Sequence, residues 1–113
     1  MAKRHGELVQ ACLDLLTLWR HEVYPVPNRG VPRRNKRTGE MVWGRGKVKP
    51  GVADICGCHA HGRFIACEIK ITPDKLRPDQ LRFKTEVELR GGLWYEVRDN
   101  TQVLLDAHGR GEV

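Results

Sequence analysis

Three charged side chains stand in or beside apolar segments, where their burial needs an explanation. Asp54 follows the short run at residues 51–53, and Glu68 and Lys70 close the apolar run at residues 64–70. Side chains alternate along a strand, so Glu68 and Lys70 are expected to share one face of a sheet. Charges in apolar surroundings are costly unless they are paired or bind a metal ion. The pattern therefore predicts a divalent-metal site.

These residue types suit the hydrolysis of a phosphodiester bond. Mg²⁺ takes oxygen ligands, and one or two carboxylates with a backbone carbonyl are sufficient to hold it. Asp54 and Glu68, on neighbouring strands, are expected to share one ion that activates water and polarises the phosphate. Lys70 is expected to orient that water or to stabilise the transition state. Gln80, at the start of the next helix, is a candidate for positioning water or phosphate.

The positive charge of the chain is concentrated in one basic segment, residues 28–50. The whole chain has a net charge of +6, and this segment holds eight basic residues and one acidic residue. Such a segment indicates contact with nucleic acid, and a solvated loop without a partner is the alternative. Trp43 is expected either to stack on a base or to anchor the segment on the body. The candidate contacts are Arg29, Arg33, Arg34, Lys36, Arg37, Trp43, Arg45, Lys47 and Lys49.

Length and composition also exclude several classes of protein. At 113 residues the chain is expected to form one domain, residues 1–113. No apolar run approaches the roughly 20 residues that cross a membrane, and no export signal is recognisable, so we expect a cytoplasmic protein without membrane contact. No small-molecule cofactor is expected. In a reducing compartment the four cysteines are expected to be free thiols or metal ligands rather than disulfides.

Periodicity and turn residues predict an α/β fold, a small mixed sheet flanked by helices. The expected order is α-β-β-β-α-β-α, with a short hairpin turning at residues 37–40 inside the basic segment. A helix between the last two strands indicates a parallel crossover, whereas the turn at residues 59–62 indicates an antiparallel pair. The expected helices are 3–21, 77–90 and 101–107, with a frayed tail from Gly109, and the expected strands are 23–27, 52–58, 63–71 and 93–98.

The first helix carries one further acidic candidate, Glu7. This residue lies in the first turn, at the edge of the apolar stripe. Glu7 is expected either to favour the helix N-terminus electrostatically or to lean over the sheet as a metal ligand. The stripe itself consists of Leu8, Cys12, Leu15, Leu16 and Trp19.

The order of motifs along nearly the whole chain resembles the VRR-NUC domain, a branch of the PD-(D/E)xK nuclease superfamily found in phages and in DNA-repair enzymes. One departure is Ala53, which stands where the superfamily pattern has Pro. The basic segment is the part that matches least well. The matching segments are residues 51–55, 66–70, 80–83 and 91–98, preceded by the helix with Glu7 and by residues 23–30.

The resemblance implies a restriction-endonuclease-like fold and cleavage of DNA that depends on Mg²⁺ or Mn²⁺. Small stand-alone members resemble Holliday-junction resolvases, which implies a homodimer acting on branched DNA, in the host cytoplasm for a phage protein. The implied metal ligands and catalytic residues are Asp54, Glu68, the Ile69 carbonyl and Glu7 as ligands, Lys70 as the catalytic lysine, and Gln80 as a site residue on the helix.

A cluster of Cys and His in the second hairpin suggests a different site, for zinc. It contains Cys56, Cys58, His59, His61 and Cys67. The spacing argues against zinc, because Cys-x-Cys lacks the usual Cys-x2-Cys knuckle and no second paired half is present. Cys67 is expected to point away from the carboxylates as a small core residue, and the histidines are expected to be exposed turn residues.

The alternative function is a basic nucleic-acid-binding module without catalysis, with or without that zinc site. It explains the basic segment and the net charge. It does not explain a glutamate and a lysine in a buried strand, nor carboxylates that face DNA without a metal ion between them. The sequence therefore favours a metal-dependent endodeoxyribonuclease.

Overall fold

A four-stranded mixed sheet forms the centre of the protein. The computed structural model describes residues 3–27, 31–44 and 49–113. The first two neighbouring pairs of the sheet are antiparallel and the last pair is parallel. The strands, in sheet order, are β1 (Glu22–Pro25), β4 (Ile55–Cys58), β5 (Phe64–Lys70) and β6 (Leu93–Arg98).

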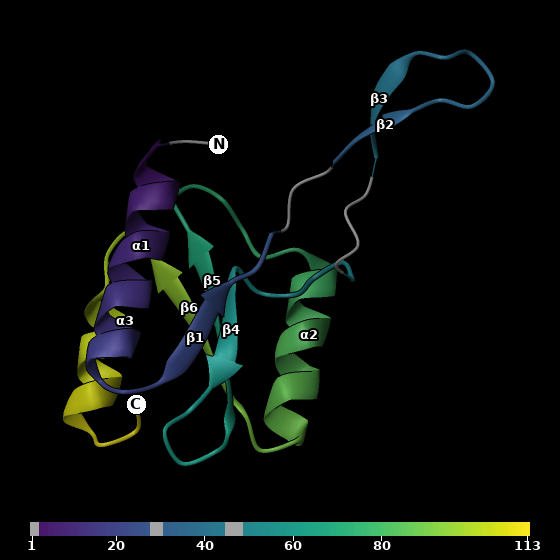
Figure 1. Cartoon of the computed structure of the whole chain (residues 1–113). Coiled ribbons are helices and arrows are strands. Elements are labelled where there is room, and N and C mark those ends of the chain that lie inside the picture. Colours follow the sequence, from purple (N-terminus) through teal and green to yellow (C-terminus); the bar gives the residue numbers. More distant parts are fainter. Residues whose placement is uncertain (1–2, 28–30, 45–48) are drawn as a thin grey trace.

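Two helices cover one face of this sheet and a third covers the other face (Figure 1). Helices α1 (Lys3–Leu18) and α3 (Gln102–Gly109) share the first face, and α2 (Pro78–Leu89), the crossover between β5 and β6, lies on the second. Strand β5 alternates accordingly. Its odd-numbered residues join the main apolar core, which consists of Leu8, Cys12, Leu16, Ile55, Ile65, Cys67, Ile69, Leu93, Tyr95, Val97, Leu104, Ala107 and Val113.

The even-numbered residues of β5 face α2. Ala66 packs there with Ala53, Val87 and Trp94 in a smaller apolar cluster. Strand alternation places Glu68 and Lys70 on this same face. The α2 side of the sheet is therefore apolar at one end and charged at the other.

The basic segment contains a two-stranded sheet separate from the main one. Strands β2 (Val31–Arg34) and β3 (Met41–Gly44) pair only with each other and form a hairpin that projects from the body (Figure 1). Its turn is closed by Asn35, whose Oδ1 accepts the N–H groups of Arg37 and Thr38 at 2.9 and 3.2 Å. The turn and strand expected inside the basic segment are thus confirmed.

The structure confirms the α/β class, the mixed sheet and the flanking helices, and it corrects three expectations. The strand expected over residues 52–58 begins only at Ile55, so Asp54 precedes this strand and does not lie on it. His59 was expected to be exposed, but it is buried, because its Nε2 lies 3.0 Å from the carbonyl oxygen of Glu112. The tail after Gly109 was expected to fray, but Val113 is buried and Tyr95 donates its hydroxyl to Glu112. The packed tail therefore helps to bury His59, whose ring centroid also lies 4.4 Å from that of His21. In the described part of the chain, no helix is both long and apolar enough to span a membrane.

Candidate metal centre

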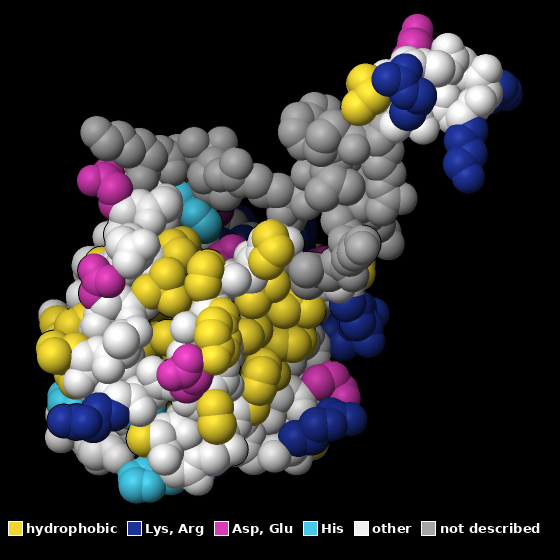
Figure 2. Space-filling model, viewed as in Figure 1, with side chains coloured by type: hydrophobic (Ala, Val, Ile, Leu, Met, Phe, Trp, Pro, Cys, Tyr) yellow, Lys and Arg dark blue, Asp and Glu magenta, His cyan; other side chains and the backbone are white. Residues whose placement is uncertain are grey.

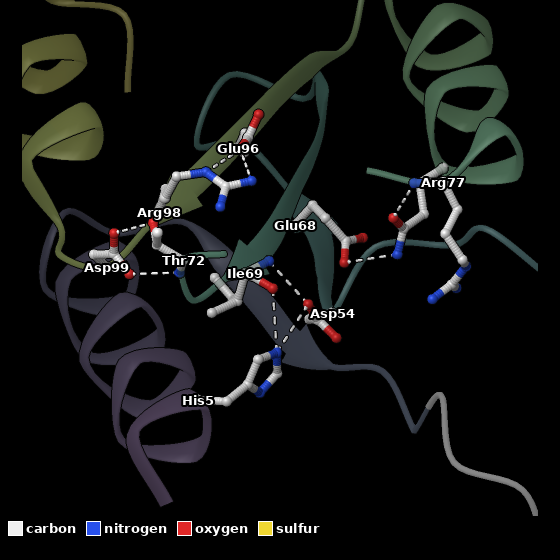
Figure 3. A network of polar contacts seen from close by, with 10 residues as sticks. His5, Asp54, Glu68, Ile69, Thr72, Arg77, Glu96, Arg98 and Asp99 are labelled. Carbon is white, nitrogen blue, oxygen red and sulfur yellow. Dashed lines mark hydrogen bonds and ion pairs between the residues drawn. The ribbon is translucent and has the colours of Figure 1, made fainter. Parts of the chain in front are cut away.

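Asp54 lies between β1 and β5, immediately before β4 begins. Its Oδ2 accepts the backbone N–H of Ile69 at 2.8 Å, and its carbonyl oxygen accepts the N–H of Val26 at 2.7 Å. The carboxylate therefore takes the place of a strand partner for β5 (Figure 3). Asp54 is held in position by the sheet itself.

Glu68 is 4% exposed, and its carboxylate is held by a hydrogen bond from Gln80. Gln80 Nε2 donates to its Oε2 at 3.1 Å. Its other oxygen, Oε1, is buried and has no hydrogen-bond partner among the described residues. A buried carboxylate oxygen without a partner is costly, so this atom is a candidate ligand for a cation.

Gln80 connects Glu68 to the first turn of α2. Its Oε1 accepts the backbone N–H of Arg77 at 2.9 Å, which caps the helix, while its amide nitrogen donates to Glu68. Both ends of the buried amide are therefore engaged within the protein. Gln80 was predicted to position water or phosphate, and in this arrangement it holds the carboxylate and the helix.

Replacing Gln80 with Ala should lower the free energy of unfolding by about 1–3 kcal/mol, because the buried Glu68 acceptor loses its donor and the helix loses a capping contact. Urea denaturation followed by circular dichroism measures this. Gln10→Ala is the matched control, since Gln10 Nε2 makes a comparable 2.9 Å bond to Asp14 at the exposed surface of α1. The control should stay within about 0.5 kcal/mol of wild type. Equal losses in the two variants would contradict the role given to Gln80.

The environment of Glu68 favours its neutral form. Burial, followed by the charge of Asp54 and a hydrogen bond with it, raises the pKa of Glu68 to about 8, against an ordinary value of 4.5. Lys70 and Arg77 oppose this shift but do not outweigh it. Two carboxylates in one poorly solvated place repel each other unless a proton or a cation lies between them.

Lys70 is buried beside this pair. It is 8% exposed, shares the strand face of Glu68, and lies opposite Arg98 in the parallel register. In the part of the chain that the structure describes, Arg98 pairs with Glu96 and Lys70 forms no ion pair. A buried ammonium of this kind is available to an anion that approaches the carboxylates.

His5 also reaches the site, which the sequence reasoning missed. Its Nε2 lies 3.2 Å from the carbonyl oxygen of Ile69 and 3.6 Å from Asp54 Oδ2 (Figure 3). A carbonyl oxygen only accepts hydrogen bonds, so Nε2 donates in the first contact. The signal was present in the sequence, because His5 precedes Leu8 and Cys12 on the same helical stripe.

Glu7, the acidic candidate on the same helix, is exposed. It lies two residues after His5, and two residues correspond to a rotation of about 200° around a helix axis. Since His5 points toward Asp54, Glu7 points to nearly the opposite side. The structure therefore brings together Asp54, Glu68, Lys70 and Gln80, and does not bring Glu7 to them.

The His59 and His61 rings of the second hairpin lie together, 5.3 Å between centroids, but its cysteines are divided between the two faces of the sheet. Cys56 lies on the α2 face, while Cys67 packs with Cys12 in the main core, as expected. His59 accepts the N–H of His61 through Nδ1, and all four cysteines are free thiols. Burial, followed by the Glu68 charge, raises the pKa of Cys56 to about 11, so this thiol stays protonated near neutrality. Within residues 3–27, 31–44 and 49–113, no three His, Cys, Asp or Glu side chains are grouped so as to hold a metal ion.

Two carboxylates and a backbone carbonyl nevertheless suit a hard divalent cation. Asp54 and Glu68 supply anionic oxygens, Glu68 Oε1 is unpartnered, and Ile69 offers the carbonyl oxygen that His5 contacts. Mg²⁺ and Mn²⁺ accept such oxygen sets and keep several waters. The residues present therefore fit a divalent cation, with Asp54 and Glu68 as its side-chain ligands.

The basic candidates divide into those that the structure describes and those that it does not. Arg34, Lys36 and Arg37 are exposed on the hairpin, and Arg34 Nη1 donates to the carbonyl oxygen of Gly39 at 2.9 Å. Lys49 is exposed next to the body. Outside the described residues lie Arg29, Arg45 and Lys47, together with the side chains of Arg33 and Trp43.

Comparison with known proteins gives no relative for this chain. No family model matches it, and neither a curated protein nor a solved structure does.

Proposed function

We propose that this protein is a metal-dependent endodeoxyribonuclease. The observation that supports this best is the buried pair Asp54 and Glu68, with an unpartnered oxygen on Glu68 and the buried Lys70 beside it. A purely structural site would have little use for two repelling carboxylates with a buried lysine beside them. A site for a divalent cation and a phosphodiester uses all three.

Each residue then has a distinct role. Asp54 and Glu68 would hold the cation, which when bound lowers the pKa of a water molecule and polarises the phosphate. Lys70 would stabilise the charge that develops on the phosphate oxygens, or orient the attacking water. Gln80 holds the Glu68 carboxylate through its 3.1 Å hydrogen bond, and the Ile69 N–H holds Asp54.

The proposal extends to the fold family and the substrate. The mixed sheet with helices on both faces agrees with a restriction-endonuclease-like fold and with the VRR-NUC resemblance. The projecting hairpin carries Arg34, Lys36 and Arg37 on its exposed surface, which suits contact with the DNA backbone away from the carboxylates. We propose branched DNA as the substrate and a homodimer as the active form.

Incubation with labelled DNA tests the proposal directly. A four-way junction, a flap and a linear duplex are each treated with Mg²⁺, Mn²⁺ or EDTA, and products are resolved on denaturing gels. Cleavage with either metal and none with EDTA is expected. Tight binding without cleavage in any metal would instead identify a non-catalytic nucleic-acid-binding module.

Lys70→Ala should reduce the cleavage rate by roughly 10²- to 10³-fold, because a charge that stabilises the transition state is removed. DNA binding measured by fluorescence anisotropy should remain. Lys70→Met preserves the buried volume and separates loss of charge from loss of packing. Lys75→Ala, at an exposed position after β5, should cleave like wild type. Normal cleavage by both Lys70 variants would remove this residue from the mechanism.

A further inference from the structure

A pocket of about 370 Å³ lies between α2 and residues 49–52 on the α2 side of the sheet. Its walls are mainly apolar and include Phe64, Phe83 and Val87. On the face shown in Figure 2, hydrophobic side chains gather over β1 and β4 and continue toward α2, with Lys and Arg side chains beside them. Pockets of this size hold small organic ligands.

Two aromatic rings form part of the pocket wall. Phe64 is 43% exposed although it begins a core strand, and its ring meets that of Phe83 edge to face at 6.3 Å between centroids. An exposed aromatic face beside a pocket is a surface on which a flat ring can stack.

The charges around the pocket favour an anionic ligand. Arg90 is engaged by Glu86 in an ion pair, whereas neither Lys49 nor Arg82 is paired with a carboxylate in the described part of the chain. Two cations without a carboxylate partner among the described residues, beside an apolar pocket, suit a ligand with a flat apolar ring and flanking phosphates.

One end of the pocket adjoins the carboxylates. Asp79 lines the pocket, and its Oδ1 accepts the N–H of Gln80, whose amide holds Glu68. The opposite wall, residues 49–52, packs against α2 at Asp79. A Cβ on Gly51 would lie only 2.3 Å from the carbonyl oxygen of Asp79. This end of the pocket is therefore separated from Glu68 by one hydrogen-bonded residue, Gln80.

We propose that this pocket takes an unpaired base of the DNA substrate, stacked against Phe64, with its flanking phosphates at Lys49 and Arg82. This inference rests on the proposed function and narrows its substrate. Bases inside a duplex are stacked and expose only their edges, so only an unpaired nucleotide can present its ring. The preferred substrate is accordingly DNA with an unpaired nucleotide near the scissile phosphate.

Three DNA molecules of equal length and charge isolate the contribution of the base. One is a flap with a three-nucleotide single strand, the second carries abasic nucleotides in that strand, and the third is a continuous duplex. Binding is measured by anisotropy in EDTA at fixed salt, so that no cleavage occurs. Wild type should bind the normal flap about tenfold more tightly than the abasic flap, as stacking on one aromatic ring predicts.

Phe64→Ala should remove that tenfold preference and leave the affinity for the abasic flap unchanged. Phe64→Leu keeps an apolar side chain and should lose most of the preference, which guards against a folding defect in the Ala variant. Leu89→Ala, at a position 73% exposed on α2 and outside the pocket wall, is the matched control and should behave like wild type.

Equal binding of normal and abasic flaps by wild type overturns the inference and leaves the pocket to an apolar segment of a protein partner. A preference that survives in both Phe64 variants also overturns it. The cleavage assay is scored separately. If the protein cleaves DNA but shows no base preference, only this inference is contradicted. If it shows the base preference but does not cleave, only the proposed nuclease activity is contradicted.

Discussion

Replacing Glu68 with Gln is expected to remove a large pH dependence of stability. With EDTA present, the wild-type free energy of unfolding should fall as pH rises from about 4.5 to about 8, by roughly 3–5 kcal/mol. The reason is that the folded state keeps the Glu68 proton up to a pKa of about 8, while the unfolded state releases it near 4.5. The stabilisation that the folded state gains from keeping the Glu68 proton is thus fully present below pH 4.5 and lost by pH 8.

Urea denaturation of wild type and Glu68→Gln across pH 4.5–8.5 measures the difference. The Gln side chain resembles the protonated carboxyl and still accepts from Gln80, so the variant should be the more stable protein at pH 8. Adding Mg²⁺ at pH 8 should stabilise wild type and leave the variant unchanged, because a ligand stabilises only the state that binds it. Parallel pH curves for the two proteins would show that Glu68 ionises normally.

Gly57→Ala is expected to lower the free energy of unfolding by more than about 4 kcal/mol, which is a large part of the 5–15 kcal/mol typical of a domain. Gly57 lies opposite Val23 where β4 pairs with β1. A Cβ at this position would lie 2.0 Å from the carbonyl oxygen of Glu22 and 2.7 Å from Val23 Cα. Both are backbone atoms, so the two strands would have to separate.

Gly6→Ala provides the opposite result in the same assay. A Cβ at Gly6 would meet nothing within 4 Å, and the residue lies inside α1. Ala in a helix is favoured over Gly by about 0.5–1 kcal/mol, so this variant should be slightly more stable than wild type. Circular dichroism during denaturation measures both. A Gly57→Ala protein with wild-type stability would contradict the observed spacing of β1 and β4.

Strand alternation explains why much of the centre could be predicted from the sequence. The period of two in β5 separates Glu68 and Lys70 from Ile69, and hydrogen bonds within β5 and its neighbours keep that order. The start of α2 was likewise marked by Pro78. Strand alternation and helix starts are local properties, so they can be predicted without knowledge of the rest of the fold.

Long-range contacts account for what the sequence did not reveal. His5 reaches Ile69, a residue 64 positions away, and His59 is buried by Glu112, 53 positions away. Gln80 was recognised as a site residue, but its second role as the cap of α2 depends on the Arg77 backbone and on Glu68 together. Residue type and spacing cannot specify such contacts, because each depends on how two distant segments pack.

The hydrogen bond between Gln80 and Glu68 has a consequence for where a strand would be cut. It fastens α2, and with it the Phe83 side of the pocket, to the strand that carries the carboxylate. One wall of the pocket is thereby connected to the carboxylate, which limits how far the two can move apart. If an unpaired base occupies the pocket and a phosphate of the same strand reaches the carboxylates, the separation of the two sites determines which phosphodiester bond is cut. The break would fall at a constant number of nucleotides from the unpaired base, whatever the surrounding sequence.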